Sequence, residues 1–456
     1  MKTIVLLLCG ALFLQGCGCS QARHIIHDVS KIEKLDTVAV YVDTSFKYPV
    51  ISDDSLMTLV QQRTFRYFWD YAHPVSGLAR ERLGSEELVT IGGSGFGVMC
   101  IPVAIERGFI SREEGAERLF KILSFLSLQA DCFHGAFPHW MDGATGKAIP
   151  FSTYDNGGDI VETALLVQGL LTAKQYFNTS DPVETVIRDC IDQIWENVEW
   201  NWYLNGQNVL YWHWSPDFAW DMNMRVNGWN EALIAYVLAA SSPTFPIPRE
   251  AYDEGWARNG EMRNGKRFYN VPLPLGPDFG GPLFFAHYSF LGLDPRELSD
   301  QYADYWEQNV NHSMINYDYC MRNPKGWVGY GQNVWGLTAC DIPDGYAACS
   351  PTDDHGVIAP TAAISSLPYI PKHSMRALRY YYYILGDRAF GEYGFCDSFS
   401  LQKQWFAPSY LAIDQGPIII MIENYRTGLL WDLFMKNVCI LDGLDKLGFE
   451  YVNQSS

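Results

Sequence analysis

Apolar residues recur at intervals of three and four along most of this chain. This spacing is clear over residues 56–71, 112–128 and 159–177, and it predicts three amphipathic helices. The same pattern predicts further helices over residues 182–198, 231–240, 300–313, 357–366, 375–385 and 418–435. Asp181-Pro182 opens one of them with a capping residue and a proline at the first helical position. No strong series of alternating polar and apolar residues occurs, so the pattern predicts an all-α fold.

Long segments rich in glycine, proline and aromatic residues separate the predicted helices. They cover residues 134–158, 201–228, 267–281 and 326–354. Loops of this length inside a compact body are usually functional. Helices that alternate with such loops favour an all-α toroid with the loops gathered at one mouth. No Pro/Ser-rich linker or charge block divides residues 48–456, so we expect a single domain there.

The N-terminus has the features of a secretory signal. Lys2 supplies a positive charge, residues 4–14 are apolar, and Leu14-Gln15-Gly16-Cys17 follows. This ending resembles the lipobox of bacterial lipoproteins, which implies that residues 1–16 are removed and that Cys17 carries a lipid anchor. An ordinary signal peptide with an incidental cysteine is the alternative. Residues 17–47 are polar and are expected to form a tether.

The residues next to Cys17 also bear on localisation. No acidic residue occurs in Gly18–Arg23, which favours a periplasm-facing anchor in the cell envelope over the cell surface. We therefore expect membrane association through the lipid.

Charge and composition narrow the class of ligand. The formal net charge is -19, which argues against nucleic acid because phosphate binding needs a basic patch. Aromatic residues make up 15% of the chain, with 15 Trp and 27 Tyr. Their flat apolar faces and polar edges suit sugars, although many of them must also be core residues.

The cysteines give little sign of a metal site. They are scattered and form no paired C-x-x-C motif, so no zinc site is expected. A disulfide cannot be assigned from the sequence.

Three carboxylates lie close together at the start of one predicted helix. Asp155 lies just upstream of the helix, and Asp159 and Glu162 are three positions apart, so they share a helix face. Acids clustered in this way suit catalysis. The alternative is a capping box, with Asp159 as the cap and Glu162 at the third helical position.

A second acid lies among tryptophans. Trp212, His213 and Trp214 precede Trp229 and Glu231 in a segment with four tryptophans. A carboxyl group beside aromatic rings is desolvated, which raises its pKa and suits a general acid in glycoside hydrolysis. The alternative is that Glu231 is a first-turn acid that faces the positive end of a helix.

A third acidic segment ends with an apolar helix. Glu423 lies in an apolar run, and a buried carboxylate must be paired, with Arg426 one turn away as the obvious partner. Asp414 precedes this predicted helix and is the freer acid.

Two further segments are interpreted as loops that face a sugar. His287 and Tyr288 follow a glycine turn, and Asp354 ends a loop, where it is most simply the N-cap of the next helix. Histidines in such positions are more often structural. We find no Gly-x-Ser-x-Gly nucleophile motif and no H-E-x-x-H metal helix. Gly92-Gly93-Ser94-Gly95 opens a helix without the strand–helix–strand context of a nucleotide site.

Several motifs together resemble the bacterial glycoamylase domain family, which is similar to glycoside hydrolase family 144. The matching motifs are Gly157–Ala164, Trp212–Pro216, Gly228–Glu231, Phe284–Phe290 and Ala412–Pro417. The resemblance covers the chain from about residue 54 to 447. It implies an (α/α)6 toroid of six helical hairpins and an endo-acting, inverting hydrolase of β-1,2-glucan that releases sophorose and short oligosaccharides without a cofactor.

The resemblance also implies roles for individual residues. The family's important acids fall on Asp155, Asp159, Glu162 and Glu231. We expect Glu231 to be the general acid and Asp155, Asp159 or Asp414 to be the base. The predicted substrate-binding residues are Trp212, His213, Trp214, Trp229, His287, Tyr288, Trp327 and Asp354.

Two alternatives to this function remain from the sequence. One is a hydrolase of the same fold with another linkage preference, including an exo-acting glucosidase of the glucoamylase type. The other is a non-catalytic glycan-binding lipoprotein, although binding alone does not need several acids in one cleft. A glucan chain is the expected partner, and we expect a monomer without a metal.

Overall fold

The computed structural model describes residues 48–451. The predicted leader, Cys17 and the tether lie outside the described residues. The chain divides into two compact units, Met1–Met57 and Thr58–Ser456, and the description below concerns the second. Among the helices that the structure describes, none is long and apolar enough to cross a membrane.

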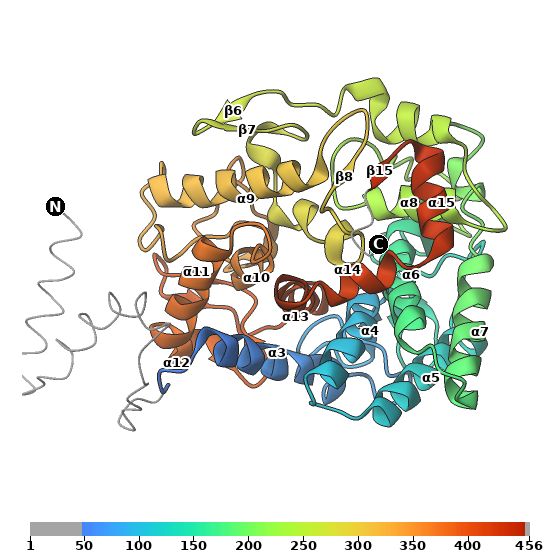
Figure 1. Cartoon of the computed structure of the whole chain (residues 1–456), viewed down its shortest axis with the longest axis horizontal. Helices are drawn as coiled ribbons and strands as arrows, with labels where there is room; N and C mark the ends of the chain where they lie inside the picture. The colour runs from blue at the N-terminus through green and yellow to red at the C-terminus, as the bar shows by residue number, and fades with distance from the viewer. Residues whose placement is uncertain (1–47, 452–456) are drawn as a thin grey trace, which may run out of the picture. The chain divides into compact units, whose positions relative to one another are not determined.

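The described part of the chain is mainly helical (Figure 1). Its α-helices are α3 (Asp53–Trp69), α4 (Ile91–Glu106), α5 (Arg112–Leu128), α6 (Ile160–Tyr176), α7 (Pro182–Glu196), α8 (Leu233–Ser241), α9 (Tyr305–Arg322), α10 (Pro360–Ser365), α11 (Pro371–Tyr383), α12 (Gly386–Ala389), α13 (Ala412–Arg426), α14 (Leu429–Phe434) and α15 (Val438–Leu447). Shorter helical turns include η3 (Ala251–Trp256), η6 (Leu283–Ala286) and η7 (Ser289–Leu291).

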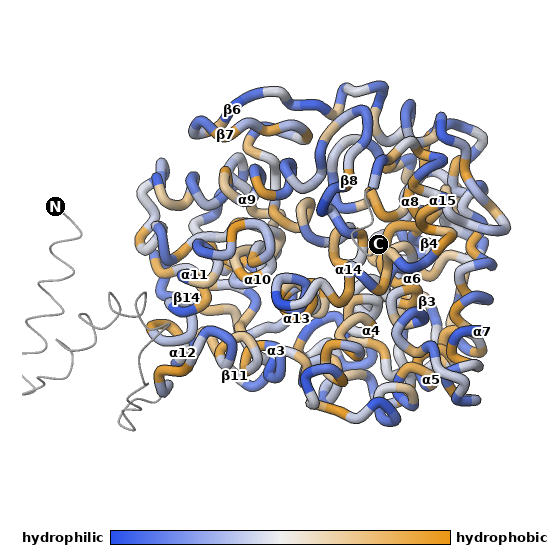
Figure 2. The backbone as a smooth tube through the Cα atoms, in the orientation of Figure 1, coloured by the Kyte–Doolittle hydropathy of each residue, from blue (hydrophilic) through white to orange (hydrophobic). Residues whose placement is uncertain are grey.

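The helices form an inner and an outer layer. All of α8 and nearly all of α4 and α6 are buried, which is typical of helices enclosed on every side. The outer helices α5 and α7 bury one face only, and Figure 2 shows α7 alternating between hydrophilic and hydrophobic residues. The outer helices α5 and α7 are therefore amphipathic, whereas α6, which was predicted to be amphipathic, is buried on nearly every side.

The inner helices pack side by side in a ring. Helix α4 contacts both α6 and α13, α6 contacts α8, and α13 contacts α10. The turns η6 and η7 lie in the remaining sector and contact α9, α8 and α13. In Figure 1, α5, α7, α9 and α11 lie toward the periphery, and α4 and α13 lie nearer the middle. The predicted all-α toroid is confirmed.

Glycines bring α4 and α6 into close contact. A Cβ atom on Gly95 would lie 2.4 Å from the Leu165 carbonyl oxygen, and one on Gly169 would lie 2.2 Å from the Gly95 carbonyl oxygen. Glycine weakens a helix by about 1 kcal/mol relative to alanine. Packing between the two backbones explains why α4 nevertheless forms a helix of full length.

Several predicted helix ends are confirmed and others are wrong. Helix α5 has the predicted bounds, and Asp159 and Asp181 cap α6 and α7. Helix α13 begins at Ala412 rather than Ile418 and contains Pro417. Gly416 and Pro417 disfavour a helix locally, but tertiary packing outweighs this preference. Gly416 packs closely on α4, since a Cβ at this position would lie 2.4 Å from Phe96 Cβ.

Glu423 forms a salt bridge with Arg107, a residue that is distant in the sequence. Arg107, the C-cap of α4, donates to Glu423 Oε1 at 2.6 Å. Gln61 and Thr427 also donate to this carboxylate. Arg426, the predicted partner, donates to Thr58 and Gln61.

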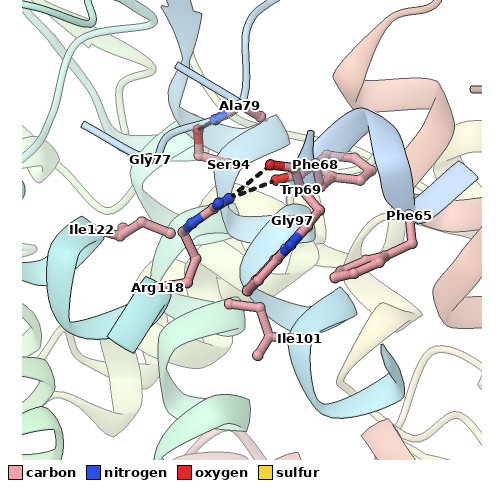
Figure 3. Close-up of a pocket in the computed structure, with 10 residues that line it drawn as sticks. All are labelled: Phe65, Phe68, Trp69, Gly77, Ala79, Ser94, Gly97, Ile101, Arg118 and Ile122. Atoms are coloured by element: carbon pink, nitrogen blue, oxygen red, sulfur yellow. Dashed lines mark hydrogen bonds between the residues drawn. The ribbon is translucent and has the colours of Figure 1, made fainter. Parts of the chain in front are cut away.

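A small cavity lies between α3, α4 and α5 (Figure 3). Arg118 donates to the carbonyl oxygens of Phe68 and Trp69, and its guanidinium lies 4.1 Å from the Trp69 ring centroid. Its positive charge therefore satisfies carbonyl groups at the C-terminal end of α3. The cavity measures about 10 Å³, so it is not a substrate site.

Short strands join the loops around the ends of the inner helices. Strands β1 (Leu88–Thr90), β2 (Trp140–Asp142) and β3 (Ala148–Ile149) form an antiparallel sheet, and β4 (Gly158–Asp159) pairs with β5 (His213–Trp214). The remaining pairs are β6 (Arg267–Phe268) with β7 (Val271–Pro272), β8 (Leu298–Ser299) with β15 (Glu450–Tyr451), β9 (Ala339–Ile342) with β10 (Gly345–Ala348), β11 (Phe390–Gly391) with β12 (Gly394–Phe395), and β13 (Phe399–Ser400) with β14 (Trp405–Phe406).

The cysteines within residues 48–451 are thiols. Cys340 and Cys349 lie closest, with their sulfur atoms 4.0 Å apart near the β9–β10 hairpin.

Candidate active site

A cavity opens where the inner helices begin. Thr90 precedes α4, Glu162 lies in the first turn of α6, Glu231 lies just before α8, and Ile413 lies in the first turn of α13. The volume is about 380 Å³, in the range of small-ligand sites. The walls of this central cavity are formed by Glu81, Arg82, Thr90, His139, Trp140, Phe151, Glu162, Glu231, Phe284, Tyr288, Ala339, Tyr346, Leu411 and Ile413.

Glu231 contributes an acid with a raised pKa. Burial raises the pKa of its carboxyl group to about 7, and the negative charges of Glu162 and Asp159 add to the rise. Helix α8 starts at Leu233 with Ala232 as its N-cap, so Glu231 lies before the helix. It is therefore not the first-turn acid that the sequence allowed as an alternative.

Glu162 lies between two helix starts. It is in the first turn of α6, and its Oε2 accepts a 2.7 Å hydrogen bond from the backbone N–H of Gly92 in α4. Burial raises the pKa of Glu162, and Asp159 and Asp155 add to the rise, whereas His139 and the Gly92 N–H oppose it. A carboxylate with these partners can hold negative charge inside the cavity wall and still accept a proton.

Two histidines and two aspartates form a compact cluster beside Glu162, which we call the His–Asp quartet: His139, Asp155, Asp159 and His213. His139 Nδ1 lies 2.9 Å from Asp159 Oδ2, and His213 Nε2 lies 3.1 Å from Asp155 Oδ2. The second contact of each ring is longer, 3.7 Å from His139 to Asp155 and 3.6 Å from His213 to Asp159. The β4–β5 pairing places Asp159 directly opposite His213.

Two of the predicted catalytic acids, Asp155 and Asp159, belong to the quartet. The Asp159 Oδ1 atom caps α6 by accepting from the backbone N–H groups of Val161 and Glu162. Burial opposes ionisation of Asp159, but the two histidines outweigh it and hold its pKa below the ordinary value. The capping interpretation is therefore confirmed for Asp159, whereas Glu162 bonds to Gly92 instead of completing the box.

Glu81 and Arg82 also line the cavity, and a second set of acidic residues lies behind them. Arg82 donates to Glu81 at 2.7 Å and to Asp341 at 3.0 Å. Behind them, the backbone N–H of Asp341 donates to Asp397 Oδ2 at 2.6 Å. Burial raises the pKa of Asp397 to about 7 and, together with the charge of Asp397, raises that of Asp414 well above its ordinary value. Asp414 is buried behind this wall, where its protonated form is favoured.

The predicted aromatic residues divide into two groups. Tyr288 lines the central cavity, together with aromatic residues that the sequence did not single out: Trp140, Phe151, Phe284 and Tyr346. Trp229 is buried against Phe290 and Tyr305 and belongs to the core.

Trp212 and Trp214 flank His213 in the sequence. His213 and Trp214 form β5, and Trp212 directly precedes this strand. Trp212 lies beside the His213 ring, with centroids 6.0 Å apart, and Trp214 packs against His134 at 5.0 Å. Neither belongs to the cavity wall, so their predicted stacking on sugar stays a prediction.

Three other predicted residues have structural contacts. His287 is buried, donates to or accepts from Ser366 Oγ at 3.0 Å, and has its pKa lowered to about 3 by burial. Asp354 accepts hydrogen bonds from Trp327 Nε1 at 2.8 Å and from Tyr330 at 2.8 Å. It is not the N-cap of α10, because that helix begins at Pro360 with Ala359 as its cap. Asp354 instead holds its loop together through these donors.

One group within residues 48–451 has the spacing of a metal site. His139, Asp155 and Asp159 offer ligand atoms within 4.8 Å of one another. Burial lowers the pKa of both histidines, but Glu162, Asp159 and Asp155 outweigh it for His139 and the two aspartates outweigh it for His213, so both pKa values rise to about 9. Two protonated histidines can therefore balance the aspartates without a metal ion.

The sequence analysis missed His139, Glu81, Arg82 and Tyr346. His139 lies in the long segment 134–158 that was interpreted as a functional loop, so its position could have suggested it. Tyr346 lies in another such segment, 326–354, whereas Glu81 and Arg82 lie outside every segment that was singled out, and only the fold brings them to the cavity.

A family model, a related protein and solved structures all match this chain. The family model described as "Putative glucoamylase" matches residues 223–438. An exo β-1,2-glucooligosaccharide sophorohydrolase of Parabacteroides distasonis is 48% identical over 88% of this chain, and the chain spans 58% of that protein's length. The structure of an endo-β-1,2-glucanase from Chitinophaga pinensis, in complex with sophorotriose and glucose, is 52% identical, covers 88% of this chain and 99% of its own, and has a TM-score of 0.86.

A third similar protein is known from Bacteroides uniformis. Its structure, described like the family model as a "putative glucoamylase", is 58% identical, covers 88% of this chain and 98% of its own, and has a TM-score of 0.87. A helical toroid with carboxyl groups in an aromatic-lined cavity is the framework of a glycoside hydrolase. The chain belongs to the bacterial glycoamylase-like family of such enzymes, whose members include β-1,2-glucan hydrolases.

Proposed function

We propose that this protein hydrolyses β-1,2-glucan by an endo-acting, inverting mechanism, with Glu231 as general acid. The observation that carries the proposal is the pair of Glu231 and Glu162 in one cavity wall. Glycoside hydrolysis uses two carboxyl groups, one protonated and one ionised. The linkage comes from the relatives, which act on β-1,2-glucan or its oligosaccharides.

Glu231 suits the acid role because its pKa is raised to about 7 by burial. At neutral pH a large share of the protein therefore holds a proton on this group. That proton can pass to the oxygen of the glycosidic bond as the bond breaks.

Glu162 is our candidate for the base in place of the three predicted aspartates. Asp155, Asp159 and Asp414 do not line the central cavity. Asp159 has a lowered pKa and is a weak base, and the pKa of Asp414 is raised well above its ordinary value, which favours its protonated form. Glu162 is in the wall, and the Gly92 N–H supports its ionised form.

The support for the endo mode is similarity to the endo-β-1,2-glucanase of Chitinophaga pinensis, which is 52% identical to this chain and has a TM-score of 0.86. The exo-acting Parabacteroides protein is 48% identical.

The test is incubation of the purified protein with linear β-1,2-glucan, starch, laminarin and cellulose, with products separated by chromatography. Activity on the first polymer alone, with an early spread of oligosaccharide lengths, supports the proposal. Sophorose as the single early product would instead establish an exo mode. Binding without products from any polymer would contradict catalysis and support a glycan-binding protein.

Stereochemistry is tested separately by proton NMR during the first minutes of hydrolysis. Inversion at a β-linkage gives the α-anomer first, and it requires the two carboxyl groups to lie roughly 6.5–9.5 Å apart to admit water. Early release of the β-anomer would exclude inversion.

We also propose that the protein is anchored in the cell envelope by a lipid on Cys17, facing the periplasm. The support is the apolar run that ends in Leu14-Gln15-Gly16-Cys17. Labelling of growing cells with a radioactive fatty acid should mark the wild-type protein and not Cys17→Ser, and equal labelling of both would contradict the anchor.

A further inference from the structure

Only one member of the His–Asp quartet reaches the central cavity. The His139 side chain is 22% exposed and forms part of the cavity wall, whereas His213 is 6% exposed and the two aspartates are buried. The His139 ring stacks on Phe151 with centroids 4.1 Å apart and meets Trp140 edge-on at 5.8 Å. These contacts fix the plane of the ring at the surface of the cavity.

The two nitrogens of His139 have different surroundings. Nδ1 is bound to Asp159 at 2.9 Å. For Nε2 we find no hydrogen-bond partner among residues 48–451. Because the two nitrogens lie on opposite sides of the ring, the Asp159 bond turns Nε2 away from the quartet.

The quartet fixes the charge of this ring. The charged groups facing His139 are Asp155, Asp159 and Glu162, with His213 beyond the aspartates. The three carboxylates outweigh burial and raise the pKa of His139 to about 9. Elsewhere on the wall, Arg82 and Glu81 pair with each other. An imidazolium is a donor at both nitrogens, so Nε2–H is available to the cavity at neutral pH.

The balance of charge matters for glycoside hydrolysis. The transition state resembles an oxocarbenium ion, which a nearby uncompensated cation would destabilise. Here two imidazolium rings face two carboxylates, so the quartet as a whole is neutral. It can therefore present a strong donor without adding net positive charge beside the reacting carbon.

We propose that His139 binds a glucosyl hydroxyl oxygen through Nε2–H as an imidazolium at neutral pH, and that Asp155, Asp159 and His213 are positioning residues that hold its charge and orientation. This inference rests on the proposed function, and it assigns the two aspartates to the support of a substrate-binding group instead of proton transfer to water. It also places the contact with sugar on His139 and not on the predicted His213.

The test compares two substitutions that each preserve one nitrogen position. The side-chain amide of His139→Asn can replace Nδ1 and keep the bond to Asp159, but it leaves no donor in the cavity. The amide of His139→Gln can reach the Nε2 position without the positive charge. Both are made in a Glu231→Gln background, so that affinity for β-1,2-gluco-oligosaccharides can be measured by calorimetry without turnover.

We expect His139→Asn to weaken oligosaccharide binding by at least about tenfold, because a hydrogen bond from a charged donor is lost. His139→Gln should recover part of the affinity. With His139 intact, affinity should hold up to pH 8 and fall as the pH rises through about 9, and this fall should be missing in His139→Asn. His373→Asn, on the outer helix α11, is the matched control and should bind like its parent.

The charge of the ring is measured independently by NMR of ¹⁵N-labelled histidine in the protein without substrate. An imidazolium signal for His139 at pH 7 supports the inference, and a neutral ring at pH 7 overturns it. Equal affinity in the Glu231→Gln protein with and without His139→Asn overturns it as well. If the Glu231→Gln protein binds no β-1,2-gluco-oligosaccharide while the NMR signal is that of an imidazolium, the proposed substrate fails and the role in sugar binding fails with it, but the quartet's charge stands.

Discussion

The backbone N–H of Gly92 donates a 2.7 Å hydrogen bond to Glu162 Oε2, and a Cβ atom at position 92 would lie 2.6 Å from the same oxygen. The glycine and the acid therefore depend on each other. Without a side chain at position 92, the carboxylate can approach the start of α4, and the start of α4 in turn supports its negative charge.

Gly92→Ala should displace the Glu162 carboxylate and reduce kcat. A shift of about 1 Å in a reacting group can cost about a hundredfold in rate, and overpacking costs about 1–3 kcal/mol of stability. Steady-state kinetics and urea unfolding measure the two effects. Gly331→Ala is the matched control, because a Cβ there meets no atom within 4 Å. Wild-type kcat in Gly92→Ala would contradict the role of this contact.

Glu231→Gln should lower kcat by about 10²–10⁴-fold, the usual contribution of a general acid, while the fold is kept. In the wild-type protein, kcat/KM should fall as the pH rises through about 7, because the group must be protonated to act. A pH–rate profile on β-1,2-gluco-oligosaccharides checks this limb. Unchanged turnover in the variant would remove Glu231 from the acid role.

The same carboxyl group should make stability depend on pH. Its folded pKa of about 7 lies above the ordinary 4.5, so its contribution is fully present below pH 4.5 and is lost as the pH rises through 7. Glu231→Gln removes this loss, so the variant should gain in melting temperature relative to wild type at pH 8 compared with pH 4. A constant difference between the two proteins across this range would contradict the raised pKa.

Gly95→Ala should destabilise the protein by about 1–3 kcal/mol or more. The new methyl group would meet the Leu165 carbonyl oxygen at 2.4 Å, and backbone atoms cannot turn aside as a side chain can. Gly169→Ala acts on the same contact from α6, so the double variant should cost less than the sum of the two single variants. Denaturant unfolding of all three variants measures this, and strict additivity would argue against one shared contact.

Glu423→Ala should lower the free energy of unfolding by about 3–5 kcal/mol, because it removes the buried carboxylate that accepts from Arg107, Gln61 and Thr427. Burial raises the pKa of Glu423, but hydrogen bonds from Arg107, Thr427 and Gln61 outweigh it, so the pKa is lowered. The stability that this group adds is therefore present above pH 4.5 and is lost as the pH falls through the lowered value.

The control for this substitution is an exposed ion pair. Glu261→Ala removes the partner of Arg258, and it should change stability by less than about 1 kcal/mol. Equal effects of the two substitutions would show that burial of the Glu423 pair does not matter.

Helix bounds were predicted best where a helix keeps one exposed face. The bounds of α5 follow from the spacing of its apolar residues, and the structure adds a capping box at Ser111. Helix α6 was also predicted, but as an amphipathic helix, and it is buried on nearly every side. Helix α13 is buried almost all round and contains Gly416 and Pro417, so neither its pattern nor its composition marks its start. The inner helices of a toroid generally give this weaker signal, because neighbours on every side replace the polar face.

The acids of the site were recognisable, but their roles were not. Asp159 and Glu162 stand out by their spacing. The sequence does not show, however, that Asp159 forms ion pairs with two histidines from other segments of the chain. Glu81 and Tyr346 come to the cavity from positions 265 residues apart, and no local pattern connects them. Contacts between distant loops decide which carboxyl group is free to react.

The inner helices start at the cavity, and this gives two glutamates different surroundings. Glu162 lies in the first turn of one helix and accepts from the first turn of another, whereas Glu231 stands before its helix. The Gly92 N–H favours the ionised form of Glu162 against the effect of burial, and burial raises the pKa of Glu231 to about 7. Under the proposed roles, an exchange of acid and base would require different helix starts, because both side chains are already glutamate.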